Sequence, residues 1–340
     1  MSAPFSKNRV KKAGKILANS SSLKEDERCA LAILDQWREV HKELFLAIPE
    51  ELKGISFTVD PDAVVVARMK RIDTIIGKLR RPGLDMKLNE MCDIVGCRII
   101  TKNIDCAFKI SSLIIKGFDV KPGTGIKDYI EHPKANGYRS THLICRRDAP
   151  QAGFRNLFCE IQVRTRLQHA WATALETYDV LSGSSLKFDG GNTLEKRFFS
   201  LVSGVFALNE GSVFVPGVPA DMDSLREEIR EINSDLYIVE KLKACSGSVT
   251  VVSQTGSFSG DAFCLLLIDY AEQKTDLFVF DTSEEAKANA LYAKREKMKA
   301  GLQDALLVRV SSLSNLNEAY PNYSSDITYF LKVLEDFLCS

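Results

Sequence analysis

The segment 157–178 constrains the fold more than any other part of the chain. The pattern of residues 157–165 predicts a β-strand that places Glu160, Gln162 and Arg164 on one face and Ile161 and Val163 on the other, because successive strand side chains point to opposite faces. The strand leads directly into a helical pattern over 167–178. A strand with one apolar and one charged face, followed at once by a helix, predicts an α+β fold with a mixed sheet.

Other segments predict further helices and strands around this one. Apolar residues at helical spacing predict helices over 25–48, 62–79, 104–115, 194–210 and 222–243, and compact apolar runs predict strands over 93–100 and 140–146. After a stretch rich in Ser, Thr and Gly at 247–260, strands are predicted near 261–270, 276–281 and 305–310, with helices at 283–301 and 325–338. We expect this last part to be a small α+β unit, separate from the first mixed sheet.

The composition excludes several classes of protein. The chain has 340 residues, equal numbers of basic and acidic residues (45 each) and 45% hydrophobic residues, as is typical of a globular protein with about two domains. Its apolar runs are far shorter than the ~18 residues that a membrane span needs. The N-terminal residues lack an apolar signal segment, so we expect a cytoplasmic protein that does not engage a membrane.

The cysteines and histidines do not form a metal-binding pattern. The nine cysteines contain no CxxC pair, and none of the four histidines lies beyond residue 169. A tetrahedral zinc site needs four ligands at short paired spacings. We therefore expect no zinc in the C-terminal half of the chain.

Basic residues cluster in two places although the net charge is zero. Residues 1–22 contain no acidic residue but carry Lys7, Arg9, Lys11, Lys12 and Lys15. A solvated tail and a nucleic-acid contact are both compatible with this cluster. The second cluster, at 68–81, overlaps the helix predicted over 62–79.

Residues 127–142 predict a loop that is unusually rich in aromatic, basic and hydrogen-bonding side chains. Pro133 and the Asn136-Gly137 pair are typical of turns, yet Lys134, Tyr138 and His142 are close by in the sequence. The common phosphate-binding glycine loops are absent, since there is no G-x-x-x-x-G-K-[ST] and no complete G-x-G-x-x-G. One hypothesis is that this loop and the charged strand face bind a polar ligand or a metal ion. The alternative is that they form an ordinary solvated surface.

In order and spacing, these segments resemble the synthetase domain of the RelA/SpoT family. The matching pieces, over roughly residues 60–180, are Arg68-x-Lys70 with Lys78, Asp93-Ile94-Val95-Gly96-x-Arg98, the KDYIxxPKxNGYxSxH stretch at 127–142 and the ExQxRT stretch at 160–165. The resemblance implies a nucleotidyltransferase-like mixed sheet. It also implies transfer of the β,γ-pyrophosphate of ATP to a ribose 3′-hydroxyl, with release of AMP.

The resemblance assigns a role to each residue. ATP-binding residues, which would neutralise the about four negative charges of a triphosphate, are Arg68, Lys70, Lys78 and Arg98. The catalytic and Mg²⁺-binding residues would be Asp93 and Glu160, and Glu160 would also take the proton of the attacking hydroxyl. Tyr138 would stack on the base of the acceptor, and the other acceptor-binding residues would be Lys134, Asn136, His142, Gln162 and Arg164. Taken singly, Asp93 and Arg98 could instead be a structural ion pair and Tyr138 a turn aromatic.

The family divides by acceptor. Small toxic members modify the 3′-terminal adenosine of the tRNA CCA end, whereas others make (p)ppGpp from GDP or GTP. The layout of the whole chain resembles the fused toxin–antitoxin Rel proteins of phage defence, called CapRel, in which a pseudo-zinc-finger domain covers the ATP site with a YxxY element. Here that element would be autoinhibitory Tyr320 and Tyr323, which on sequence alone are also compatible with ordinary core or turn aromatics.

This resemblance divides the chain into a basic tail and helix at 1–60, a pyrophosphokinase (toxin) domain at 61–215, a connecting helix at 216–244 and a C-terminal antitoxin domain at 245–340. It implies a toxin that modifies the tRNA 3′ end with ATP and is activated by a phage structural protein such as the major capsid protein. Two alternatives stay open: a (p)ppGpp synthetase with a C-terminal sensor domain, and a catalytically inactive nucleotide-binding regulator. A monomer is compatible with the extra domain.

Overall fold

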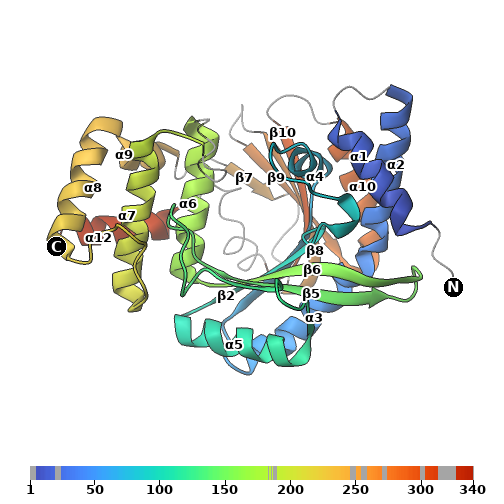
Figure 1. The fold of residues 1–340 in the computed structure, drawn as a ribbon, viewed down its shortest axis with the longest axis horizontal. Coiled ribbons are helices and arrows are strands. Elements are labelled where there is room, and N and C mark those ends of the chain that lie inside the picture. The colour runs from blue at the N-terminus through green and yellow to red at the C-terminus, as the bar shows by residue number, and fades with distance from the viewer. Residues whose placement is uncertain are drawn as a thin grey trace.

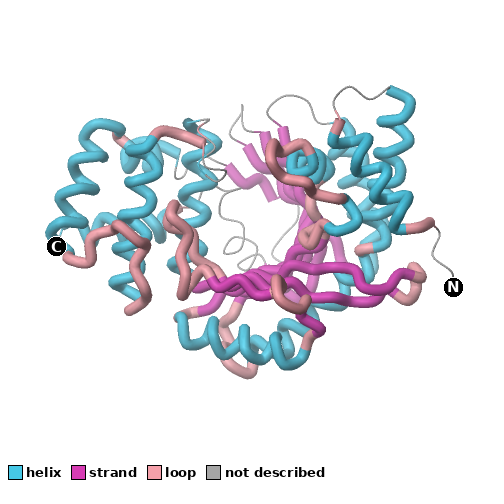
Figure 2. The backbone as a smooth tube through the Cα atoms, in the orientation of Figure 1, coloured by secondary structure: helices cyan, strands magenta, loops and turns pink. Residues whose placement is uncertain are grey.

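One curved mixed sheet and one helical bundle make up the protein (Figure 1, Figure 2). The structure is a computed structural model, and it describes residues 5–19, 24–182, 184, 186, 190–245, 250–253, 259–269, 274–298, 303–312 and 327–339. Tyr320 and Tyr323 lie outside these residues. None of the helices described has the length and apolarity that crossing a bilayer requires.

The sheet combines strands from most of the chain. They are β1 (Val64–Met69), β2 (Val95–Thr101), β3 (Asp119–Val120), β4 (Ile126–Asp128), β5 (Thr141–Ala149), β6 (Phe154–Thr165), β7 (Thr250–Ser253), β8 (Ser259–Asp269), β9 (Lys274–Asp281) and β10 (Gln303–Ser312). Their order is β3-β5-β6-β2-β1-β10-β8-β9-β7, and β4 pairs with β5 outside this path. The pairs β2–β6 and β7–β9 are parallel, and the other pairs are antiparallel. The mixed sheet predicted from the sequence is confirmed.

In the part of the chain that the structure describes, six α-helices lie around the sheet. They are α1 (Lys7–Ala18), α2 (Lys24–Val40), α3 (Lys42–Phe57), α4 (Ile72–Leu79), α5 (Ile104–Gly117) and α10 (Glu285–Met298), with short 3₁₀ helices at Leu88–Glu90 and Thr282–Glu284. Helices α3 and α5 cover one face of the central strands, and α10 packs on β8 and β10 (Figure 1). The single helix predicted over 25–48 is wrong: the chain turns at His41, which separates α2 from α3.

The helical bundle contains the last helix of the chain. Its members are α6 (Arg166–Ser182), α7 (Thr193–Glu210), α8 (Met222–Leu236), α9 (Ile238–Cys245) and α12 (Thr328–Cys339). The helix predicted over 222–243 is interrupted at Tyr237, whose left-handed backbone (φ 53°) ends α8. Phe330 and Leu334 of α12 are buried among α6, α7 and α8. The C-terminal part of the chain therefore contributes both to the sheet and to the bundle.

The prediction of a separate C-terminal sheet is wrong, because β10 pairs directly with β1. Ala67 lies opposite Arg309, and Arg68 lies opposite Val308. Strand β1 is buried on both faces: Val65 packs in the core beneath the helices, and Val66 packs in a second core on the opposite face. A buried strand needs hydrogen-bond partners along both edges, and β2 and β10 supply them.

The helix predicted over 62–79 is also wrong, since its first part is β1 and only its second part is α4. Val64, Val65 and Val66 are β-branched and buried, which favours a strand held between two cores. The apolar spacing of this segment is also compatible with a helix, but its burial between two cores favours the strand. Arg68 therefore lies on a strand, and Lys70 lies in the connection between β1 and α4.

The basic N-terminal residues form a packed helix, not the solvated tail that was one of the two interpretations left open by the sequence. Val10, Ala13 and Leu17 of α1 are buried in the main core. The Lys7 ammonium group donates hydrogen bonds to the carbonyl oxygens of Arg155 and Asn156, at 2.8 and 3.0 Å, in the turn between β5 and β6. Lys7 is therefore a structural residue.

Candidate functional site

The sheet and the bundle enclose a cavity of about 340 Å³ that is rich in charged side chains. Every residue predicted to bind ATP, metal or acceptor lines this cavity, with the exception of the two autoinhibitory tyrosines, which lie outside the described residues. The lining residues that were predicted are Arg68, Lys70, Lys78, Asp93, Arg98, Lys134, Asn136, Tyr138, His142, Glu160, Gln162 and Arg164. The structure thus brings together residues from four separate segments.

Sequence reasoning missed three polar residues of the cavity wall, Thr74, Arg81 and Glu176. Thr74 precedes Lys78 by one helical turn on α4, so the two share a face of that helix. Arg81 belongs to the basic cluster at 68–81 that the sequence showed. Glu176 lies on α6, where its neighbours in the sequence are mostly apolar and gave no signal.

The strand register places the charged residues on one face of the sheet. Gln162 of β6 lies opposite Arg98 of β2 and opposite His142 of β5. Arg68 of β1 lies opposite Gly96 of β2. Because directly opposite residues point to the same side of a sheet, the four strands present their polar side chains to one cavity.

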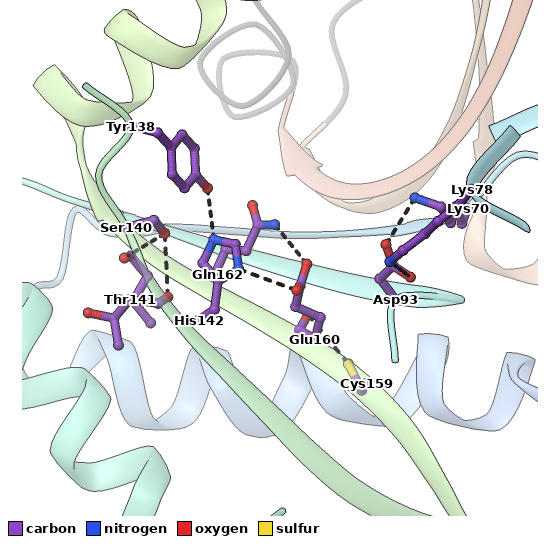
Figure 3. A network of polar contacts seen from close by, with 11 residues as sticks. Lys70, Lys78, Asp93, Tyr138, Ser140, Thr141, His142, Cys159, Glu160 and Gln162 are labelled. Carbon is purple, nitrogen blue, oxygen red and sulfur yellow. Dashed lines mark hydrogen bonds and ion pairs between the residues drawn. The ribbon is translucent and has the colours of Figure 1, made fainter. Parts of the chain in front are cut away.

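Asp93 binds two lysines at one side of the cavity. Its Oδ2 accepts a hydrogen bond from the Lys70 ammonium at 3.0 Å, and its Oδ1 accepts one from the Lys78 ammonium at 2.9 Å (Figure 3). Burial raises the pKa of the Asp93 carboxyl, but Lys70 and Lys78 outweigh it and hold that pKa below its ordinary value. Asp93 is therefore ionised at neutral pH.

Glu160 is the centre of a second hydrogen-bonded chain (Figure 3). Its Oε1 lies 3.3 Å from His142 Nδ1, and its Oε2 accepts a hydrogen bond from Gln162 Nε2 at 2.9 Å. The hydroxyl oxygen of Tyr138 lies 2.8 Å from His142 Nε2. Burial raises the pKa of Glu160, but His142 and Gln162 outweigh it and lower that pKa to about 2. A carboxylate with so low a pKa binds a proton weakly, which favours cation binding over the expected role as proton acceptor.

Arg164 carries a charge in a buried position. Only 3% of the residue is exposed, and its Nε has no hydrogen-bond partner among the residues that the structure describes. Burial, together with Arg98, lowers the pKa of Arg164 to about 9, while Tyr138 and Glu176 act in the opposite sense. A buried cation is stabilised when an anion lies beside it, so this part of the cavity favours an anionic ligand.

The loop at 127–140 presents two tyrosine rings to a lysine. The Lys134 ammonium lies 4.7 Å from the ring centroid of Tyr129 and 5.1 Å from that of Tyr138, within cation–π distance. The Tyr138 ring also meets His142 and Trp171 edge to face. The flat ring and the basic side chain beside it suit a base with a phosphate attached.

Bonds to α7 fix this loop in place. The Ser203 hydroxyl donates to the Gly137 carbonyl oxygen at 2.7 Å, and Arg139 Nε donates to the Ser203 hydroxyl at 3.0 Å. Gly137 has φ +96°, and a Cβ there would come within 2.8 Å of Ser203 Cβ and 3.0 Å of the Trp171 ring. The position therefore requires glycine.

Substituting Gly137 by Ala should displace Tyr138 from the cavity. Both the positive φ and the contact with α7 oppose the added methyl group, so we expect a stability loss of about 1–3 kcal/mol and at least about tenfold lower activity. Thermal unfolding and initial rates measure the two effects. Gly211→Ala is the control, since Gly211 also has positive φ (62°) but nothing within 4 Å of a Cβ, and it should lower stability without lowering activity. Equal activity of the two variants would contradict the role of this loop.

The two carboxylates fit a magnesium ion that arrives with its phosphates. Mg²⁺ in phosphate-transferring sites is held by one or two carboxylates together with phosphate oxygens and waters. Asp93 and Glu160 line one cavity, both have lowered pKa values, and the charge of Glu160 opposes ionisation of Asp93. Among the described residues no group of three His, Cys, Asp or Glu side chains could hold a metal alone, so substrate phosphates would complete the coordination.

Comparison with known proteins identifies the region around this cavity. Residues 67–178 match the family described as "Region found in RelA / SpoT proteins". GTP pyrophosphokinase YwaC of Bacillus subtilis is 34% identical over 112 residues, which are 32% of this chain and 53% of that protein. GTP pyrophosphokinase YjbM of the same organism is 32% identical over 133 residues, 36% of this chain and 62% of that protein. The chain thus spans about half the length of YwaC, the first of these curated relatives.

A longer match covers more of the chain. An uncharacterized protein of Mycobacterium tuberculosis is 27% identical over 241 residues, 70% of this chain and 75% of that protein. Among solved structures, a GTP pyrophosphokinase family protein from Streptococcus pneumoniae is 21% identical, with a TM-score of 0.44, covering 62% of this chain and 97% of that one. The RelA/SpoT region therefore coincides with the strands and loops that form the cavity.

Proposed function

Because residues 67–178 carry the RelA/SpoT region, we propose that the protein transfers the β,γ-pyrophosphate of ATP to a ribose 3′-hydroxyl. The observation that carries the proposal is the single cavity that two ionised carboxylates, Asp93 and Glu160, line together with several cations. Transfer of a phosphoryl-type group depends almost entirely on positioning and on stabilising charge. The cavity supplies both.

Different side chains of the cavity bind the two substrates. On the β1–α4 side, Arg68, Lys70 and Lys78 bind the triphosphate, and the two lysines transfer hydrogen bonds from Asp93 to phosphate oxygens. Asp93 and Glu160 would hold Mg²⁺, which would supply positive charge to the phosphate oxygens.

On the other side of the cavity, the loop and β6 bind the acceptor. The Tyr138 ring stacks on its base, and Lys134 and Arg164 bind its phosphates. Glu160 is held in place by His142 and Gln162, so the two halves of the site meet at this carboxylate.

The acceptor that we propose is the 3′-terminal adenosine of tRNA. Arg81 lines the cavity, and the neighbouring Arg80 donates a hydrogen bond from Nε to the Leu17 carbonyl oxygen of α1 at 2.8 Å. Helix α1 carries further exposed basic residues, Lys12 and Lys15 among them. These basic residues lie on the α4 side of the cavity, so an acceptor bound at Tyr138 contacts them only if it extends past the ATP side. A polyanion can do this and a mononucleotide cannot, and each basic residue that it reaches neutralises a further backbone phosphate. A tRNA with pyrophosphate on its 3′ end cannot be aminoacylated, so such an enzyme is a translation-blocking toxin.

A second acceptor class is favoured by a different observation. The relatives YwaC and YjbM are named GTP pyrophosphokinases, which supports GDP or GTP as acceptor and (p)ppGpp as product. The two candidates share the ATP side of the site and differ in what the Tyr138 side must accept.

The test offers each acceptor separately. The protein is incubated with ATP labelled at the γ-phosphate and with bulk tRNA, GDP or GTP. Label in tRNA supports the toxin, and label in guanine nucleotides alone overturns it in favour of alarmone synthesis. Label in none of them, with both the unaltered protein and a variant carrying Tyr320→Ala and Tyr323→Ala, contradicts pyrophosphate transfer. A variant with both Asp93→Asn and Glu160→Gln shows the background.

We further propose that the C-terminal region restrains this activity, as in the CapRel proteins, and that a phage structural protein such as the major capsid protein releases it. The restraint is a shift between a closed and an open population. In support, β10 pairs with β1, which carries Arg68, so this region contacts the ATP side of the site directly.

Substituting Tyr320 and Tyr323 by Ala in the full chain should make the protein toxic to cells without any trigger. If these rings occupy the adenine site, removing them should raise basal transfer by at least about tenfold, as expected for two buried aromatic contacts. Colony counts after induced expression measure the effect. Point substitutions are preferable to truncation before residue 245, because truncation also removes the strand that pairs with β1. Harmless expression of the double variant, at a level where the protein is folded, would contradict autoinhibition.

A further inference from the structure

Glu296 of α10 connects the C-terminal region to α4, the helix that carries Lys78. Its Oε1 accepts a hydrogen bond from the backbone N–H of Ile72, the first residue of α4, at 2.9 Å. Its Oε2 accepts a hydrogen bond from Arg38 Nη1 at 3.0 Å. Glu296 is buried, with 8% of the residue exposed. A carboxylate that is distant in sequence therefore acts on the start of this helix.

The start of α4 needs this acceptor. Arg71, at the N-cap position, makes no side-chain capping bond, and the first N–H groups of a helix have no partner within the helix. A carboxylate at this end satisfies one N–H group and also interacts favourably with the helix dipole. Glu296 thus supplies the capping bond that the side chain of Arg71 does not make.

Arg38, which binds Glu296, is itself held by Tyr292. Arg38 Nη2 donates a hydrogen bond to the Tyr292 hydroxyl oxygen at 3.1 Å, and Arg38 Cζ lies 5.7 Å from the centroid of the Tyr292 ring. Arg38 belongs to α2, and Tyr292 lies one helical turn before Glu296 on α10. The carboxylate therefore has a fixed position relative to the sheet.

The position of α4 determines where the cations of the ATP side lie. Lys78 is on α4, and Lys70 lies two residues before Ile72, the first residue of that helix. Both lysines donate hydrogen bonds to Asp93. Thr74 and Lys78 line the cavity. At the other end of the helix, Arg80 is bonded to α1. A displacement of about 1 Å in a positioning element can lower a rate by about 10²-fold, so the bond at the start of α4 matters for the site.

We propose that Glu296 is a positioning residue, which fixes α4 and thereby places the ammonium groups of Lys70 and Lys78 for the triphosphate. The identity of the ligand rests on the proposed function. In this arrangement the C-terminal region is part of the ATP-binding architecture in addition to any restraint that it exerts. Its helix α10 supplies the contact that α4 lacks.

The test compares Glu296→Ala with a matched control, Asp261→Ala, in the full chain. Asp261 of β8 also joins the N-terminal helices to the C-terminal strands: its Oδ1 lies 2.5 Å from Lys53 Nζ of α3, and its Oδ2 lies 3.0 Å from Arg309 Nη2. It makes no bond to α4 among the contacts of the described residues. A second cavity of about 450 Å³ adjoins Glu296 and Arg38, so water can reach Arg38 when the carboxylate is removed.

Two readouts are needed. The first is the Kd for α,β-methylene ATP, a non-hydrolysable analogue, and the second is the hydrogen-exchange rate of the first-turn amides of α4 without nucleotide. We expect Glu296→Ala to weaken binding about tenfold and to speed this exchange about tenfold, as expected for a lost hydrogen bond to a charged group. Asp261→Ala should change both by less than about twofold, even where it lowers the melting temperature. Glu296→Gln keeps an oxygen acceptor for Ile72 but loses the negative charge, so we expect it to change both readouts by only about threefold.

The outcomes separate this proposal from the proposed function. Equal binding and equal exchange in Glu296→Ala and Asp261→Ala would overturn the positioning role. If neither the unaltered protein nor the variant carrying Tyr320→Ala and Tyr323→Ala binds the ATP analogue, the proposed function fails, and the exchange of the α4 amides alone decides whether Glu296 positions the helix. Should Glu296→Ala fail to fold, Glu296→Gln is compared with the unaltered protein instead. The expected result is then a change of about threefold in both the Kd and the exchange rate. No change in either quantity would overturn the proposal.

Discussion

Replacing Asp93 by Asn or Glu160 by Gln should lower pyrophosphate transfer by at least about 10³-fold. Each substitution keeps the shape of the side chain and removes the negative charge that we propose holds Mg²⁺ against the phosphates. Loss of one such electrostatic contribution costs about 10²–10³ in rate, and loss of a metal ligand adds to it. Single-turnover rates with labelled ATP measure the effect at saturating acceptor.

The matched control is Glu228→Gln. Glu228 is a partly buried carboxylate in the bundle, where it forms an ion pair with Arg197. Its substitution should leave the rate within about twofold of that of the unaltered protein, because Glu228 lies outside the cavity. If Asp93→Asn or Glu160→Gln keeps more than about a tenth of the original rate, the metal-binding assignment is wrong.

The second large effect is expected at Arg164. Its guanidinium is buried and its Nε has no hydrogen-bond partner among the described residues, so its charge costs stability in the unliganded protein. We expect Arg164→Met to lower kcat/KM at least about 10²-fold and to leave the melting temperature unchanged or higher. A loss of activity with a gain of stability is characteristic of a residue kept for function.

Arg197→Met serves as the comparison for this prediction. Arg197 forms a bidentate pair with Glu228, with distances of 2.5 and 2.7 Å, and also donates to the Gly217 carbonyl oxygen. Its substitution should lower the melting temperature and leave activity intact, the opposite of Arg164→Met. If Arg164→Met lowers the melting temperature as much as Arg197→Met, Arg164 is a structural cation.

The composition of the candidate site could be predicted from the sequence because its residues lie in short, ordered segments. The alternation of Glu160, Gln162 and Arg164 along one strand is enough to place them on one face. The motif order then joins them to Asp93 and to the loop that contains Tyr138. The structure puts all of these side chains around one cavity.

The arrangement of the C-terminal region could not be predicted from the same kind of pattern. Pairing between β1 and β10 depends on burial of β1 from both faces, and a run such as Val64-Val65-Val66 has no periodicity that separates a strand from a buried helix. The contact between Glu296 and Ile72 is a single hydrogen bond between distant segments. Local patterns carry no information about such a partner.

The pairing of β1 with β10 also sets the order in which the protein can be completed during synthesis. Strands β1, β2 and β6 leave the ribosome first, but the outer edge of β1, beside Arg68, stays unpaired until β10 has been made. Chains fold from the N-terminus as they are synthesised, so a partly made chain has an exposed strand edge where the ATP side of the site belongs. An enzyme of the kind proposed would therefore become competent only after the region that restrains it has been translated, which protects the cell that makes it.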